Sequence, residues 1–71
     1  MPTVAETGAE IERLQARVKQ AYLEIRKVSR PYEASIALLV GIPERRVWSL
    51  LCGAGIICHR REDSRGIYLD G

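Results

Sequence analysis

The chain has 71 residues, which is enough for one small domain but leaves little apolar interior to stabilise it. It combines 46% hydrophobic with 28% charged residues and carries a net charge of only +2, so composition alone indicates a folded globular protein and does not by itself indicate nucleic acid as a partner. The longest uncharged apolar run, residues 36–43, is too short to cross a bilayer, and the amino end lacks the apolar core of a secretory signal. We expect a cytoplasmic protein with no membrane partner, in which residues 1–6 form a flexible tail and residues 7–71 form a single domain.

A long amphipathic helix is the first expected element. Thr7 and Glu10 fit a capping box, and Thr3 with Glu6 offers the same pattern one turn earlier. Apolar residues then recur at steps of three and four, which predicts a helix over residues 8–28. The stripe expected to be buried consists of Ile11, Leu14, Val18, Tyr22, Ile25 and Val28. A stripe of this length also suits pairing with a second copy, so a homodimer through this helix stays open as an alternative.

Two shorter helices are expected to meet at a tight corner. Pro31 suits the first turn of a helix because its missing N–H costs nothing there, which predicts a second helix over residues 31–40 that ends at Gly41. Pro43 has the same role for a third helix, which is expected to end at Gly53. The residues of the second helix that should be buried are Ile36, Leu39 and Val40.

The third helix is expected to have one apolar and one polar side. At 100° per residue its apolar side holds Val47, Leu50, Leu51 and Ala54, and its opposite side presents Arg45, Ser49 and Cys52. Arg46 and Trp48 fall on the flanks between the two sides, and the tryptophan is expected to pack rather than to stack on a base. Arginine and serine can contact phosphates and base edges, so Arg45 and Ser49 make this polar side the candidate reading surface.

A β-hairpin is expected at the carboxyl end of the chain. Residues 56–61 and 67–69 are typical of strands, and residues 62–66 contain the turn formers Asp63, Ser64 and Gly66. Because an isolated hairpin is unstable in water, its apolar residues should pack on the helices. These residues are Ile57, Ile67 and Leu69. Three arginines should project at or near the tip of the hairpin: Arg60, Arg61 and Arg65.

Residues 31–70 resemble a winged helix-turn-helix domain of the kind found in MarR-type and ArsR-type regulators. The spacing of Ala37, Gly41, Val47 and Leu50 matches the helix-turn-helix, Ala54-Gly55-Ile56-Ile57 resembles the usual exit from the recognition helix, and Asp63-Ser64-Arg65-Gly66-Ile67-Tyr68-Leu69 resembles the wing. The resemblance implies an α+β, mostly α fold with a three-helix core and a C-terminal two-stranded wing. It also implies binding to double-stranded DNA, with Arg45, Arg46 and Ser49 in the major groove and the wing arginines Arg60, Arg61 and Arg65 on the backbone or in the minor groove.

The chain departs from the family pattern at the corner and at its end. Pro43 stands where a serine or threonine cap is usual, and Glu44 would repel phosphate unless it accepts from a cytosine amino group. The sequence stops just after the second wing strand, which favours a minimal regulator of the phage or plasmid type or an excisionase-like recombination factor. Since winged helices also bind proteins, the alternative function is a protein-binding winged helix that modulates the transcription machinery, for example a phage-type RNA polymerase regulator.

The sequence contains no motif for catalysis. His59 and Cys58 are adjacent and Cys52 lies six residues earlier, but no second pair has the spacing of a zinc site, so no metal and no cofactor are expected. No phosphate-binding glycine loop or nucleophile elbow occurs, and we do not expect an enzyme. Two cysteines in such a protein should be reduced thiols, and an exposed Cys52 would be open to oxidation.

Overall fold

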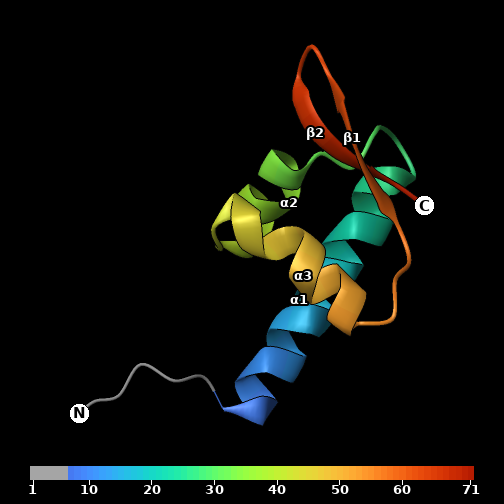
Figure 1. The fold of residues 1–71 in the computed structure, drawn as a ribbon. Coiled ribbons are helices and arrows are strands. Elements are labelled where there is room, and N and C mark those ends of the chain that lie inside the picture. The colour runs from blue at the N-terminus through green and yellow to red at the C-terminus, as the bar shows by residue number, and fades with distance from the viewer. Residues whose placement is uncertain (1–6) are drawn as a thin grey trace.

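The computed structural model describes residues 7–71, which form three helices followed by a two-stranded antiparallel hairpin (Figure 1). The α+β, mostly helical fold class expected from the sequence is therefore confirmed, whereas the expected tail, residues 1–6, lies outside the described residues. In chain order the elements are α1 (Gly8–Arg26), α2 (Glu33–Val40), the 3-10 helix η1 (Glu44–Arg46), α3 (Val47–Gly53), β1 (His59–Asp63) and β2 (Gly66–Asp70).

Helix α1 begins with the expected capping box. The backbone N–H of Glu10 donates to the Thr7 hydroxyl at 3.2 Å, and the backbone N–H of Thr7 donates to the Glu10 carboxylate at 3.1 Å. At its other end the helix stops at Arg26, because the chain tightens and the N–H of Val28 bonds to the carbonyl of Ile25. This turn moves Val28 off the buried stripe. The expectation that Val28 is buried is wrong, since it is 86% exposed.

Helix α2 begins at Glu33, two residues later than Pro31 suggested, and ends at Gly41 as expected. Gly41 adopts the left-handed conformation, with φ of 85°, which residues with a Cβ rarely take, so glycine suits the corner. Leu39 was expected in the core but is 62% exposed. The apolar residues by which α2 packs against the rest of the core are Ile36, Ala37 and Val40.

The third helix starts with a 3-10 turn rather than with an α-helix from Pro43 onward. Pro43 precedes η1, which continues directly into α3, and α3 ends at Gly53 as expected. Val47, Leu50 and Leu51 are buried, which confirms the apolar side deduced from the spacing.

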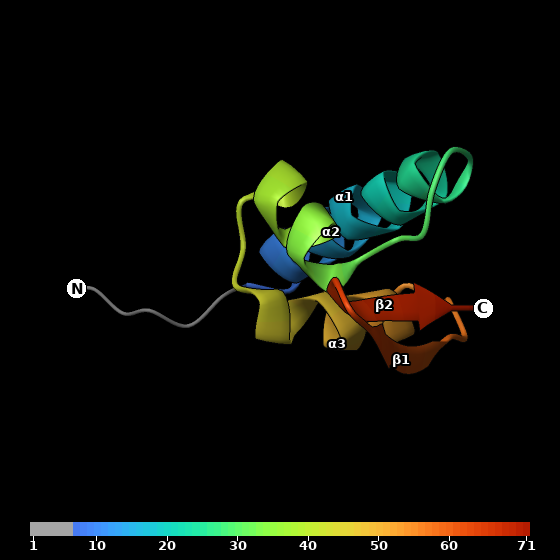
Figure 2. The ribbon, with the colours of Figure 1, turned by 90° about the horizontal axis from the view of Figure 1, so that it is seen from above.

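One apolar core joins the three helices to the hairpin. Helix α1 packs against both α2 and α3, and Figure 2 shows α1 and α2 on one side of the molecule with α3 and the hairpin on the other. Among residues 7–71, no helix has both the length and the apolarity needed to cross a bilayer. The buried apolar residues are Val18, Ala21, Tyr22, Ile36, Ala37, Val40, Val47, Leu50, Leu51, Cys58 and Leu69.

The hairpin begins later than the sequence suggested, at His59 instead of Ile56. Residues 56–58 form a connection in which burial alternates along the chain, so Ile56 is half-buried, Cys58 is buried and Ile57 points outward. The expectation that Ile57 packs on the helices is wrong, since it is 87% exposed. Neighbours along an extended chain face opposite ways, and only one of the two sides here meets the core.

The strands also run closer to the turn than expected. Asp63 pairs with Gly66, which leaves only Ser64 and Arg65 as the loop. The Asp63 carboxylate accepts the backbone N–H of Arg65 at 2.8 Å, and Gly66 has a φ of 126°. Figure 1 shows this turn as the end of the hairpin farthest from α3.

Candidate nucleic-acid interface

The outward side of η1 and α3 carries the residues that the sequence assigned to it. Arg45, Ser49 and Cys52 are exposed at steps of four and three, whereas Val47 and Leu50 face the core. The buried residues fix the rotation of the helix, because turning it would expose them to water. A polar ridge with one arginine at its start is therefore held outward by the packing behind it.

The two flanking residues differ from this ridge. Arg46 is half-buried and is engaged in an interaction within the chain. Trp48 is 41% exposed, and its indole N–H donates to the carbonyl of Cys58 at 3.3 Å. This hydrogen bond joins α3 to the segment that leads into β1, so Trp48 has a packing role here.

Arg60 lies on the inner face of the hairpin. In the register of the strands it is opposite Leu69, which is buried. Its guanidinium donates two hydrogen bonds to the Glu33 carboxylate, at 2.8 and 3.2 Å, and the Glu33 side chain is almost completely buried. The hydrogen bonds to Glu33 raise the pKa of Arg60. Arg60 therefore neutralises a carboxylate at the start of α2 instead of projecting from the tip of the hairpin.

Arg61 and Arg65 are more available than Arg60. Arg61, the next residue of β1, faces the other side and pairs with Asp70 at 2.8 Å, with both side chains more than half exposed. Exposed pairs of this kind are worth little and open easily. Arg65 lies in the turn and is exposed, and neither Arg65 nor Arg45 has an ion-pair partner among residues 7–71.

A cluster around Asp63 attaches the hairpin to the loop before α2, and no sequence pattern predicted this cluster. The Asp63 carboxylate accepts from the Tyr32 hydroxyl at 2.5 Å and from the Arg30 guanidinium at 2.6 Å. The Arg30 guanidinium lies over the ring of Tyr68, 4.6 Å from its centroid. Tyr32 pairs with Tyr68 in an antiparallel bridge, and the N–H of Leu69 donates to a backbone carbonyl of the same loop at 3.0 Å.

The cluster also changes the acidity of its members. The hydrogen bond from Tyr32 lowers the pKa of Asp63, and the N–H of Arg65 and the guanidinium of Arg30 act in the same direction. The same contact with Asp63 raises the pKa of Tyr32. Asp63 is therefore held as a carboxylate that accepts three hydrogen bonds, one of which fixes the turn.

The cysteines lie in different surroundings. Cys52 and Cys58 are both free thiols, the first exposed and the second buried. Burial raises the pKa of Cys58, which makes this thiol less reactive. Within residues 7–71 no three histidine, cysteine or acidic side chains come together as a set that could hold a metal ion.

No protein-family model, curated protein or solved structure matches this chain. The geometry itself defines a small α+β domain in which two helices meet at a glycine corner and a hairpin is fastened to the start of the first of them.

Proposed function

We propose that this chain is a winged helix-turn-helix protein that binds double-stranded DNA in the cytoplasm, as a transcription regulator or as an accessory factor in recombination. In this proposal η1 and α3 enter the major groove, and the hairpin is the wing that contacts the DNA backbone beside it. The chain would act by binding, without chemistry of its own.

The observation that carries the proposal is the outward ridge of η1 and α3. Arg45 and Ser49 are exposed one turn apart, and Arg45 has no ion-pair partner among residues 7–71. A guanidinium can make two hydrogen bonds to the major-groove edge of guanine, and a serine hydroxyl can contact a base or a phosphate. Arg46 was also expected to contact the groove, but its half-buried position supports a smaller contribution.

The contacts of the three wing arginines suggest different roles in DNA binding. Arg65, in the turn, has no ion pair within residues 7–71 and suits a phosphate contact. Arg61 can exchange its exposed partner Asp70 for a phosphate at little cost. Arg60 is committed to Glu33, so we assign it the role of holding the wing in position.

The test compares two arginine variants on two kinds of duplex. A preferred site is first selected from a pool of random duplexes, and binding to it and to an unrelated duplex is then measured by fluorescence anisotropy at several salt concentrations. Arg45→Ala should weaken binding to the selected site by about 5- to 150-fold, equivalent to about 1–3 kcal/mol, with a smaller effect on the unrelated duplex. Arg65→Ala should weaken binding to both duplexes and reduce the salt slope by about 1.

Arg13→Ala is the matched control, because Arg13 is an exposed arginine on α1 and its loss changes the net charge by the same amount. If Arg45→Ala and Arg65→Ala bind both duplexes as the Arg13 control does, the assignment of this surface is wrong.

The alternative function is a protein-binding winged helix that modulates the transcription machinery without contacting DNA. It is favoured by the number of arginines already engaged within the chain, since Arg30, Arg60 and Arg61 are all paired with carboxylates. This alternative predicts no salt-dependent affinity for DNA at micromolar protein, together with stable capture of one cellular protein in a pull-down.

A further inference from the structure

The outer face of α2 is apolar and uncovered. Leu38 is 86% exposed and Leu39 also points into solvent, with the small residues Ala34 and Ser35 one turn earlier on the same face. The only charged residue of α2 is Glu33, which is buried. An α-helix of a small domain normally presents charged side chains to water, so this uncharged face indicates a surface that becomes covered.

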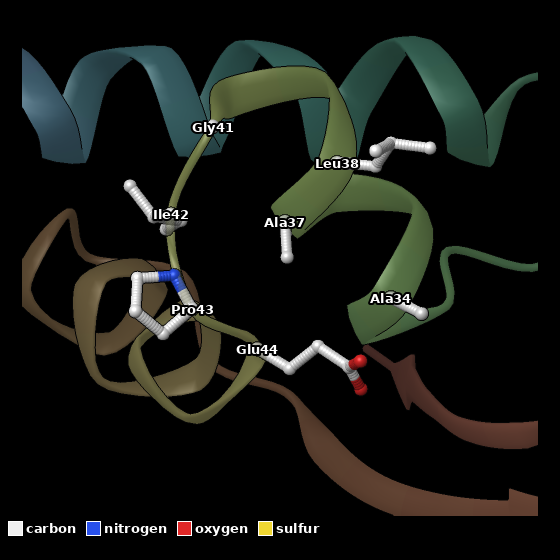
Figure 3. Close-up of a pocket in the computed structure, with 7 residues that line it drawn as sticks. All are labelled: Ala34, Ala37, Leu38, Gly41, Ile42, Pro43 and Glu44. Carbon is white, nitrogen blue, oxygen red and sulfur yellow. The ribbon is translucent and has the colours of Figure 1, made fainter.

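The shape of this face is a ridge between two hollows. Leu38 borders both of them: one of about 430 Å³ beside Ile25 and Leu39, and one of about 530 Å³ beside Ala37 and the corner. Figure 3 shows the second hollow, which is open to solvent and is bordered across from α2 by Ile42, Pro43 and Glu44. A protruding leucine next to a hollow of apolar lining is complementary to a second copy of itself.

Charged residues beside the leucines have the arrangement that a symmetric pair requires. Arg17 and Glu24 of α1 line the same side of a further hollow with Leu39, two helical turns apart and on either side of Gln20. Both residues are exposed, although Arg17 also donates to the carbonyl of Val40 at 3.2 Å, and Glu24 accepts from Gln20 at 2.8 Å and lies 3.6 Å from the amine of Lys27. If a twofold axis passes perpendicular to α1 at the level of Gln20, the α1 helices of the two copies run antiparallel. This arrangement therefore places Glu24 of each copy opposite Arg17 of the other, so that opposite charges meet at both edges of the apolar contact.

We propose that this face, formed by Leu38 and Leu39 of α2 with Arg17 and Glu24 of α1, is the interface of a symmetric homodimer. The apolar stripe of α1 contributes Val18 and Tyr22 to the interior of its own chain, so the dimer uses the neighbouring side of that helix. The occupant is a second copy because both parts of the surface, the ridge with its hollow and the pair of charges, are complementary to themselves.

The available area limits how tight this dimer is. A standard interface removes about 800 Å² from each partner, which is about one sixth of the 4878 Å² that this chain exposes. The face described here offers only two large exposed apolar side chains of α2, Leu38 and Leu39, for such a contact. We therefore expect a dissociation constant of about 1–100 µM, in the range of weak symmetric pairs.

The test measures molar mass by sedimentation equilibrium over protein concentrations from about 1 µM to about 1 mM, which bracket the expected dissociation constant. The parent chain, of 8.0 kDa, should approach twice that mass as concentration rises. Leu38→Glu and Leu39→Glu should each raise the dissociation constant by at least about 30-fold, because they place a carboxylate in the apolar contact. Ile57→Glu is the matched control: Ile57 is as exposed as Leu38 but lies in the other layer, before β1, and its variant should dimerise like the parent.

A charge exchange tests the symmetry independently of the leucines. Arg17→Glu alone and Glu24→Arg alone should weaken the dimer by about 5-fold each, and the double variant should restore it, because the pairs re-form with reversed sign. Circular dichroism of each variant checks that the monomer is folded, because Arg17→Glu also removes the hydrogen bond that Arg17 donates to the carbonyl of Val40. A monomeric parent at every concentration, a dimer that survives Leu38→Glu and Leu39→Glu, or equal loss in Ile57→Glu would overturn the proposal.

Discussion

The helical core and the hairpin are held in place by different forces. Helix α3 is fixed by apolar burial, with Val47 and Leu51 completely inaccessible to water behind the exposed ridge. The hairpin strands bury one apolar side chain, Leu69, and are also attached by polar contacts, from Arg60 to Glu33 and from Tyr32 and Arg30 to Asp63. The difference shows that an arginine in this chain can be either a free surface charge or a structural fastener, and that residue type alone does not separate the two.

The largest loss of stability should come from a substitution in the apolar core behind α3. Leu51→Ala removes a fully buried side chain and should lower the free energy of unfolding by about 3 kcal/mol, measured by urea denaturation with circular dichroism. Ile57→Ala removes an exposed apolar residue and should change that free energy by less than about 0.5 kcal/mol. Equal losses in the two variants would mean that the core is not where the structure places it.

A smaller loss of stability should follow from breaking the inner ion pair of the hairpin. Arg60→Ala leaves Glu33 nearly buried without its partner, so it should destabilise the hairpin more than Arg61→Ala, which breaks an exposed pair. Hydrogen exchange of the β1 and β2 amides provides the measurement. The double variant Glu33→Met/Arg60→Met should recover part of the loss, because no uncompensated charge remains; recovery would not occur if Arg60 acted only through its own packing.

The smallest effect should be a dependence on acid. Because the pKa of Asp63 is lower in the folded chain than in the unfolded chain, its contribution to stability is present above about pH 4 and is lost as the pH falls through the lower, folded value. Asp63→Asn should therefore be less stable than the parent at pH 7 and should lose less stability on acidification, as measured by thermal unfolding between pH 2 and 7. Asp70→Asn, which alters only the exposed pair with Arg61, serves as the control. If both variants show the same dependence of unfolding temperature on pH, Asp63 is not the source of the acid effect.

Sequence patterns predicted the parts of this fold that depend on neighbours along the chain. The capping box of Thr7 and Glu10, the glycine corner at Gly41 and the two sides of α3 all follow from spacings of three or four residues. The ends of elements were less accurate. Val28 and Ile57 were both assigned to the interior, and both are exposed because a local change of direction, at the end of α1 and before β1, turns them outward.

The polar contacts that attach the hairpin could not be predicted from spacings along the sequence. Glu33 and Arg60 are 27 residues apart, and Tyr32 and Asp63 are 31 apart, so no local periodicity connects them. A glutamate in the first turn of a helix is normally read as a solvent-exposed charge beside the helix dipole. Only the register of the hairpin, which turns Arg60 inward and Arg61 outward, shows which arginine neutralises it. The sequence therefore overstated how many arginines are available to a partner.

The attachment of the hairpin at two points along β1 has a thermodynamic consequence for binding. Glu33 and Asp63 tie β1 and the turn to the beginning of α2, and α2 is joined to α3 through the corner at Gly41. A ligand that touches α3 and the hairpin together meets two surfaces whose relative orientation is already set, so association costs little conformational entropy. The hairpin is ordered relative to α3 when the chain folds. Without the ion pair between Glu33 and Arg60, part of that loss of conformational entropy should occur on binding instead.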